Sequence, residues 1–234
     1  MERWIKILSK WFEIQIMIDL HTHTFLSDGE LSPNELVQRA RRMGYTAMAI
    51  TDHVDVSNIE IVVKEIVRFC NEVKNYYGDI IVLPGVEITH VVPSYINDMG
   101  EFAKKSGIKV VVVHGETIVE PVEEGTNKEA IRSEYTDILA HPGLILEEDI
   151  ILAKENQKYI EITARKGHSL TNGHVAKLCK KHNVKMVLNT DSHSPENLIT
   201  DEMAKKILKG AGLDDTDIIS VFQNSLDIVK RYTI

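Results

Sequence analysis

The chain has 234 residues, of which 43% are hydrophobic and 26% are charged, and its formal net charge at pH 7 is −8. That amount of apolar material is enough for a full core, and the length is within the usual range for one domain. The negative charge argues against an extended contact with nucleic acid, because proteins that bind a polyphosphate backbone normally present a basic face. Small substrates fit this composition better than long DNA.

No apolar stretch approaches the roughly 20 residues that a membrane-spanning helix needs. The two cysteines, Cys70 and Cys179, lie in segments predicted to be helical and lack the spacing of a Cys-x-x-Cys metal site. We therefore expect a soluble, cytoplasmic protein that does not bind a membrane. Both cysteines are expected to be packing residues.

Residues 1–16 are predicted to form an N-terminal extension or helix. Trp4, Leu8 and Phe12 are spaced four apart, which is an amphipathic helical pattern, but the apolar stretches are too short for a secretory signal. Three interpretations stay open: a helix that closes the bottom of the fold, an upstream extension with Met17 as the natural start, or a surface-binding helix. Residues 17–234 are predicted to form a single domain.

From residue 16 onward, short apolar runs alternate with helical patterns of ten or more residues. The predicted strands are residues 16–20, 47–51, 80–86, 109–113, 137–140, 159–163 and 185–190. The predicted helices are residues 33–43, 58–76, 94–106, 146–156, 171–182, 195–209 and 214–231. This alternation predicts an α/β fold of parallel strands with crossover helices, and seven strands favour a barrel.

Histidine and acidic residues follow directly after the carboxyl ends of these strands. His21 and His23 follow the first strand, and their spacing on an extended segment directs both imidazoles to one face. The other residues at strand ends are Asp52, His53, Glu87, His114, His141, Asp191 and His193. In a parallel barrel the carboxyl ends of the strands share one rim, which is where such folds carry their chemistry.

Imidazole nitrogens and carboxylate oxygens gathered at one rim are a typical set of metal ligands. Taken singly, each histidine fits the role of a hydrogen-bonded loop residue as well as that of a metal ligand. Taken together and without a cation, these groups would be crowded with no partner. The pattern therefore predicts a metal site at the carboxyl-terminal rim.

The order of several short motifs resembles the PHP family, named for polymerase and histidinol phosphatase. The motifs are HTH (21–23), SDG (27–29), TDH (51–53), GVE (85–87), His114, AHPG (140–143) and DSH (191–193). The resemblance spans residues 17–195. It implies a distorted seven-stranded (β/α)7 barrel, two or three divalent metal ions (zinc, manganese or iron) and a phosphoesterase activity.

The resemblance also implies three metal sites that share ligands. Their ligands are, in turn, His21, His23, Glu87 and Asp191; Glu87, His114 and His141; and Asp28, His53 and His193. Glu87 and Asp191 then supply the charge that can bridge neighbouring cations in catalysis. Asp28 stands where some members of the family have histidine, so the third site departs from their pattern.

Asp52 directly precedes His53, and two roles are open for its carboxylate. It either orients a ligand histidine and so supports catalysis, or it forms a salt bridge or loop cap. Glu116 and the loop of residues 120–127 are candidates for the border of the pocket.

Four residues are candidates for binding the substrate. Arg165 and Lys166 follow the sixth strand, where a guanidinium can bind a phosphate from the open side of the metal cluster. A solvated cationic turn is the alternative. His168 can contact the substrate or protonate the leaving group, and His90 can line the rim.

We predict a phosphoesterase similar to histidinol phosphatase, which hydrolyses a small phosphomonoester with water activated by metal ions. The chain lacks the GxxxxGK[ST] and GxSxG motifs of nucleotide-triphosphate and serine hydrolases. Two alternatives remain: a metal-dependent hydrolase of another class, such as a nuclease acting on short nucleic acids, and a non-catalytic subunit. The SDG, TDH and Asp-x-His motifs favour the PHP interpretation over other barrels that begin with His-x-His. All nine proposed ligand positions carry competent side chains, which favours an enzyme.

Overall fold

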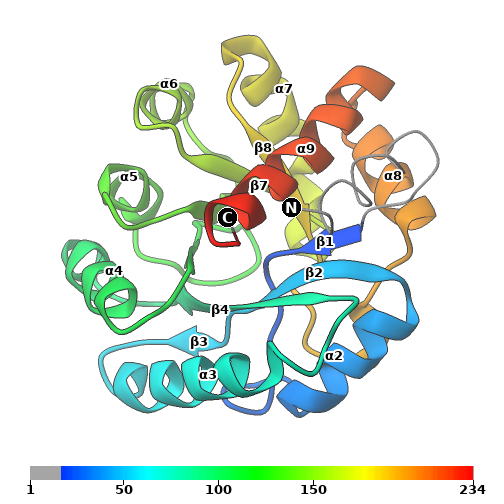
Figure 1. Cartoon of the computed structure of the whole chain (residues 1–234). Coiled ribbons are helices and arrows are strands. Elements are labelled where there is room, and N and C mark those ends of the chain that lie inside the picture. The colour runs from blue at the N-terminus through cyan, green and yellow to red at the C-terminus, as the bar shows by residue number, and fades with distance from the viewer. Residues whose placement is uncertain (1–16, 234) are drawn as a thin grey trace.

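The structure, a computed structural model, describes residues 17–233. Seven parallel strands form most of a barrel in the order β1-β2-β4-β5-β6-β7-β8. The strands are β1 (Met17–Asp19), β2 (Tyr45–Ile50), β4 (Ile81–Ile88), β5 (Val110–His114), β6 (Ile138–Ala140), β7 (Tyr159–Thr163) and β8 (Met186–Asn189). The predicted α/β fold, a distorted (β/α)7 barrel, is confirmed (Figure 1). The interpretations of residues 1–16 lie outside the described residues.

The barrel is nearly closed by contacts between the segments that follow β1 and β8. The Asp191 amide donates to the His21 carbonyl at 2.9 Å, and the His23 amide donates to the Ser192 carbonyl at 2.8 Å. Thr22 and Ser192 form an isolated parallel bridge. This seam brings the HTH and DSH motifs, the two ends of the predicted site, side by side.

A short additional strand, β3 (His53–Val54), was not predicted. The chain leaves the sheet after β2 and returns to it at His53, where β3 pairs with β4 and not with the end of β2. In this register His53 lies opposite Glu87. The interruption therefore places two of the predicted site residues directly across from each other.

Helices surround the barrel (Figure 1). They are α2 (Pro33–Arg42), α3 (Ile59–Val73), α4 (Ile96–Lys105), α5 (Thr126–Arg132), α6 (Glu147–Glu155), α7 (Asn172–His182), α8 (Asp201–Gly210) and α9 (Asp215–Arg231). The seven-residue helix α5 was missed because so short a segment carries little helical periodicity. The helix predicted for 195–209 was also wrong at its start: residues 195–197 form a 3₁₀ turn, and the Thr200 side chain caps α8 by accepting from the Met203 amide.

The strands are buried on both faces, as is usual in parallel sheets covered by helices. Strand β5 illustrates the alternation. Val110 and Val112 belong to the apolar cluster inside the barrel, whereas Val111 and Val113 belong to the larger cluster between the sheet and the helices. All four side chains are fully buried. Alternate valines of this run thus pack into two different apolar clusters.

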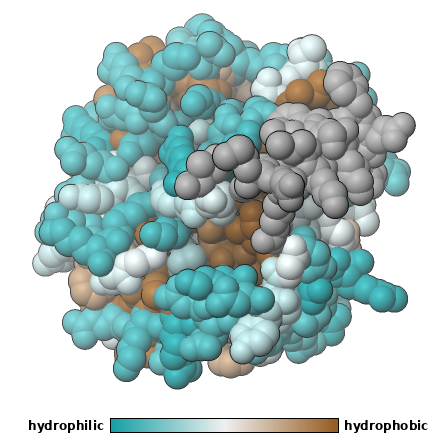
Figure 2. Space-filling view, in the orientation of Figure 1, coloured by the Kyte–Doolittle hydropathy of each residue, from teal (hydrophilic) through white to brown (hydrophobic). Residues whose placement is uncertain are grey.

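Helix α9 closes the amino-terminal end of the barrel. Leu226, Ile228 and Val229 of this helix join the apolar cluster of the barrel interior. Figure 1 shows α9 crossing this end, and Figure 2 shows that the same face is largely hydrophilic with an apolar area near its middle. The opposite, carboxyl-terminal rim is left for the polar residues.

None of the described helices has the length and apolarity to cross a bilayer. Cys70 and Cys179 are free thiols buried in α3 and α7, as predicted.

Candidate metal centre and pocket

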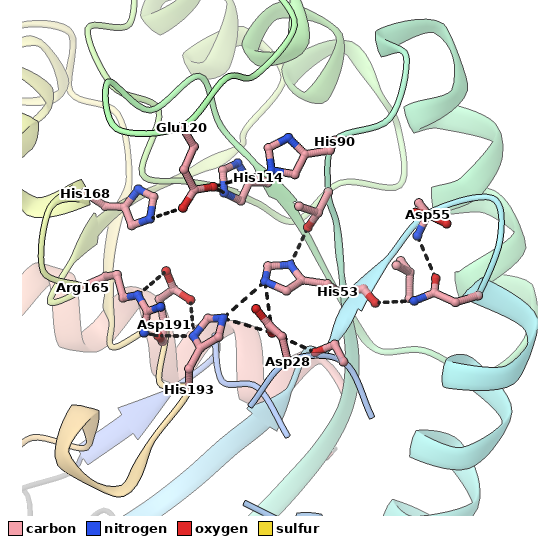
Figure 3. A pocket seen from close by; sticks show the side chains of 14 residues that line it. Asp28, His53, Asp55, His90, His114, Glu120, Arg165, His168, Asp191 and His193 are labelled. Atoms are coloured by element: carbon pink, nitrogen blue, oxygen red, sulfur yellow. Dashed lines mark hydrogen bonds and ion pairs between the residues drawn. The ribbon is translucent and has the colours of Figure 1, made fainter. Parts of the chain in front are cut away.

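The predicted site residues surround a pocket of about 420 Å³ at the carboxyl-terminal rim. Figure 3 shows this pocket. Its lining includes Asp28, His53, His90, His114, Arg165, His168, Asp191 and His193. A deeper layer of four side chains lies beneath it and is at most 2% exposed; it comprises His21, His23, Glu87 and His141. The structure thus brings the dispersed motifs into one cluster.

Glu87 lies at the centre of the cluster. It lies near the end of β4, and its fully buried carboxylate is 2.8 Å from His53 Nδ1 and 3.3 Å from His21 Nε2. The Nε2 atoms of His23 and His141 lie 3.5 and 3.7 Å away. Burial raises the pKa of Glu87, but His21 and His53 outweigh it and hold that pKa well below its usual range.

Asp191 is the second shared carboxylate. It follows β8, and its oxygens lie 3.2 Å from His23 Nε2, 3.5 Å from His141 Nε2 and 3.6 Å from His21 Nε2. Burial raises the pKa of Asp191 to about 7. Asp191 and His141 both have positive φ, at 51° and 25°, which is uncommon for residues with a side chain. Such backbone strain clusters at functional sites, and here it occurs at two predicted ligands.

Many polar atoms of the deep layer and of Asp191 lack a hydrogen-bond partner among the described residues. These atoms are His21 Nε2, both ring nitrogens of His23 and of His141, Glu87 Oε1 and Asp191 Oδ1. Buried polar groups in native proteins are normally paired, so each unpaired group needs an explanation. Bound cations supply one, since they accept lone pairs from the carboxylate oxygens and from one nitrogen of each neutral imidazole.

The spacing of these atoms also fits a metal. Ligand atoms about 2.1 Å from a tetrahedral cation lie about 3.4 Å from one another. The distances of 3.2 to 3.7 Å between Asp191 or Glu87 and the Nε2 atoms of His21, His23 and His141 bracket this value. They are longer than good hydrogen bonds. The mixed nitrogen and oxygen donors suit zinc, manganese or iron.

Ligand atoms lie within 4.8 Å of one another in several groups. One group lies within the deep layer: His21, Glu87 and His141. A second joins two histidines of that layer to a shared carboxylate: His21, His23 and Asp191. A third is the predicted third site with His23 added: His23, Asp28, His53 and His193. His114 differs from the prediction. It falls in a group with His141 and His168 and in another with His90 and Glu120, not in one with Glu87.

Glu120 accounts for this difference. Its carboxylate lies 3.1 Å from His114 Nε2, 3.3 Å from His168 Nε2 and 3.6 Å from His90 Nε2 (Figure 3). The hydrogen bond to His114 lowers the pKa of Glu120 to about 2. The predicted border loop of residues 120–127 thus contributes a residue to the pocket. Glu116 does not line the pocket and instead accepts from the Gly125 and Asn127 amides.

Arg165 and Lys166, adjacent in sequence, are placed differently. Arg165 lines the pocket, where its Nη1 donates to the Asn197 side chain at 3.1 Å and its Nε lies 3.9 Å from Asp191. Lys166 is exposed and is not among the lining residues, so the structure does not bring it into the pocket with Arg165. Successive residues leaving a strand point in different directions, and only one of the two faces the pocket.

The structure shows the partners of Asp52, for which the sequence left two roles open. Its buried carboxylate accepts from the amide and hydroxyl of Thr24, at 2.7 and 2.8 Å, and from the amide and hydroxyl of Ser27, at 3.2 and 2.8 Å. All four contacts go to the loop that carries Asp28, and none goes to a histidine ring. Asp52 is therefore a loop cap, one of the two roles left open by the sequence.

Two polar partners of the histidines were missed by the sequence analysis. Thr89 lies 2.6 Å from His53 Nδ1, and Glu161 lies 2.9 Å from His21 Nδ1. The signal for Glu161 was present in the sequence, because a charged residue in the apolar run YIEIT cannot be buried without a partner. The run was interpreted only as a strand.

The barrel, the motif order and the polar rim together define a protein of the PHP family. The PHP domain family model matches residues 19–199, and the chain belongs to this family. The resemblance inferred from the motifs is thereby confirmed.

Among its relatives, an uncharacterized protein of Methanocaldococcus jannaschii is 52% identical over 200 residues, covering 86% of this chain and 92% of that protein. A probable phosphatase of Acetivibrio thermocellus is 31% identical over 205 residues, covering 77% of this chain and 80% of that protein. The crystal structure of histidinol phosphate phosphatase from Lactococcus lactis, complexed with zinc, L-histidinol and phosphate, has a TM-score of 0.59 at 18% identity. The match covers 84% of this chain and 94% of that one, and it shows that the two share a fold.

Proposed function

We propose that this protein is a metal-dependent phosphatase that hydrolyses a small phosphomonoester. The observation that carries the proposal is the layer of buried, unpartnered ligand atoms of His21, His23, Glu87, His141 and Asp191 beneath the pocket. Membership of the PHP family and the relatives named probable phosphatases support the same class of reaction.

Two or three divalent ions would be held by the groups described above. Glu87 and Asp191 are the shared carboxylates, and Asp28, His53 and His193 with His23 form the more exposed group. Bound cations would polarise the phosphoryl group and lower the pKa of a coordinated water. The zinc in the structure of the Lactococcus lactis enzyme supports zinc as the first metal to test.

The remaining pocket residues would act on the substrate directly. Arg165 would bind the phosphoryl oxygens, since a guanidinium at the wall of a metal cluster suits a bidentate contact with phosphate. His168 is buried and held by Thr117 at 2.7 Å and Glu120 at 3.3 Å. From that position it would donate a proton to the leaving oxygen. His90 is more exposed and would contact the outer part of the substrate.

The substrate proposed first is similar to histidinol phosphate, because the Lactococcus lactis structure contains L-histidinol and phosphate. A panel of phosphorylated metabolites tests this directly. Phosphate release is measured with protein reconstituted in zinc, manganese or iron, beside elemental analysis of the purified chain.

We expect two or three divalent ions per chain and phosphate release from at least one small monoester. Folded protein that takes up none of these metals would exclude a metal-dependent reaction. Metal-loaded protein that cleaves a labelled oligonucleotide internally, with no release from monoesters, would replace the phosphatase with a nuclease. Metal-loaded protein that attacks neither substrate would favour the non-catalytic subunit.

A further inference from the structure

A buried polar chain runs from β7 to the deep layer of the metal centre. Glu161 lies on β7, is fully buried, and lies outside the pocket lining and outside every group of candidate metal ligands. Its Oε2 atom is 2.9 Å from His21 Nδ1 and 2.8 Å from the side-chain nitrogen of Asn189. A carboxylate in this position needs partners, and His21 is one of them.

The direction of each hydrogen bond between Asn189, Glu161 and His21 follows from one backbone amide. The amide of Leu20 can only donate, and it donates to Asn189 Oδ1 at 2.9 Å. The other end of the Asn189 amide is therefore its NH₂ group, which donates to Glu161 Oε2. Glu161 Oε2 is a carboxylate oxygen that accepts both contacts, so His21 donates through Nδ1.

This arrangement determines which nitrogen of His21 is free. With the proton on Nδ1, the neutral ring carries its lone pair on Nε2. Nε2 faces the metal centre, 3.3 Å from Glu87 and 3.6 Å from Asp191, and has no hydrogen-bond partner among the described residues. The ring is thus held in the orientation of a metal ligand, and Nδ1 keeps its proton when Nε2 binds a cation.

We propose that Glu161 is a positioning residue that presents His21 Nε2 to a cation and strengthens that nitrogen as a donor. The proposal rests on the metal binding proposed above. A carboxylate behind a ligand histidine raises the basicity of the ring. His114 and His193 have uncharged partners at Nδ1, the Gly115 carbonyl at 3.1 Å and the Asp191 carbonyl at 2.9 Å, whereas His53 Nδ1 lies 2.8 Å from the Glu87 carboxylate.

Two variants separate the charge of Glu161 from its hydrogen bond. Glu161→Gln keeps the shape and one acceptor oxygen but removes the charge, whereas Glu161→Ala removes the acceptor. Zinc affinity is measured by competition with a chromophoric chelator, and we expect losses of about 10-fold for Gln and about 100-fold for Ala. The loss should fall on the sites that use His21, and zinc bound by Asp28, His53 and His193 should be retained.

Asp137→Asn is the matched control. Asp137 directly precedes β6, at the opposite end of the barrel, and its carboxylate accepts from the Val111 amide at 2.9 Å. This variant also removes a largely buried carboxylate charge, but it should leave zinc affinity unchanged. Thermal unfolding of each variant separates loss of fold from loss of metal.

A second measurement reports the tautomer itself. In zinc-loaded protein with ¹⁵N-labelled histidine, NMR should show a slowly exchanging proton on His21 Nδ1, identified by its disappearance in His21→Asn. That proton should exchange rapidly in Glu161→Ala. Folded Glu161 variants that keep both the protected Nδ1 proton and a zinc affinity within about twofold of the wild type would overturn the positioning role. Wild-type protein that binds no zinc would instead refute the proposed function.

Discussion

At the scale of single residues, the centre depends on carboxylates that are shared between several imidazoles. Glu87 faces His21, His23, His53 and His141 at once, while being fully buried. A buried charge of this kind is stable only when it is compensated on several sides. Its loss should therefore affect more than one cation position.

The first prediction compares Glu87 with His90. Glu87→Ala should lower kcat/KM by at least about 10- to 100-fold, because it removes a carboxylate contact from four histidines. His90→Ala should have a small effect, because the side chain of His90 is 46% exposed and its ion-pair contact is Glu120 at 3.6 Å. Kinetics on the best monoester of the panel, with metal content measured in parallel, test this. Equal losses in the two variants would show that the shared carboxylate is assigned wrongly.

The second prediction concerns Arg165. If its guanidinium binds the substrate phosphate, Arg165→Ala should weaken turnover of small phosphates while metal content stays unchanged. Arg165→Lys should restore turnover only in part, since a lysine offers a point charge and not a bidentate fork. Lys166→Ala is the matched control, because Lys166 is exposed and outside the pocket. A loss of metal in Arg165→Ala would mean that the residue supports Asp191 and not the substrate.

At the scale of elements, the loops at the strand ends are held by close backbone packing. In the AHPG motif after β6, Gly143 has φ of +62°, and a Cβ at this position would lie 2.0 Å from the Glu116 carbonyl oxygen. Gly115, after β5, would place a Cβ 2.3 Å from the Ala140 carbonyl oxygen. These two glycines allow the loops after β5 and β6 to pack together, which positions His114 and His141.

The third prediction follows from this packing. Gly143→Ala should destabilise the protein by more than about 1 kcal/mol, because both the left-handed backbone and the space are unsuited to a side chain. Gly173→Ala is the control, since Gly173 lies in α7 with nothing within 4 Å of its added Cβ. That substitution should stabilise the helix by roughly 0.5–1 kcal/mol. Urea unfolding midpoints of the two variants should move in opposite directions, and a shared direction would contradict the packing argument.

At the scale of the whole molecule, the charge of −8 limits the partners that the protein can bind. Affinity for duplex DNA depends on cationic side chains that displace counterions from the phosphates. The fourth prediction is that the metal-loaded protein binds duplex DNA weakly at physiological salt while it hydrolyses small monoesters. Fluorescence anisotropy with a labelled duplex, over a series of salt concentrations, measures this. Tight binding with a steep salt dependence would contradict this prediction. It would indicate a local basic surface on a protein whose net charge is negative.

Much of this molecule follows from local sequence. The alternation of apolar runs and amphipathic segments determines the β/α order, because strands and helices have different side-chain periods. Parallel strands then place their carboxyl ends at one rim, so the positions of His21, Glu87, His114 and Asp191 at the ends of four different strands were enough to predict a shared site. Both inferences need only the order of residues along the chain.

Tertiary structure alone decided how those residues are used. The return of the chain at β3 sets His53 opposite Glu87, and loop packing turns His114 toward Glu120. The directions of side chains leaving a strand separate Arg165 from Lys166, and contacts across the barrel assign Asp52 to a loop and Glu161 to His21. These partners are distant in sequence, so no local periodicity encodes them. Each contact depends on angles and register that only the closed barrel defines.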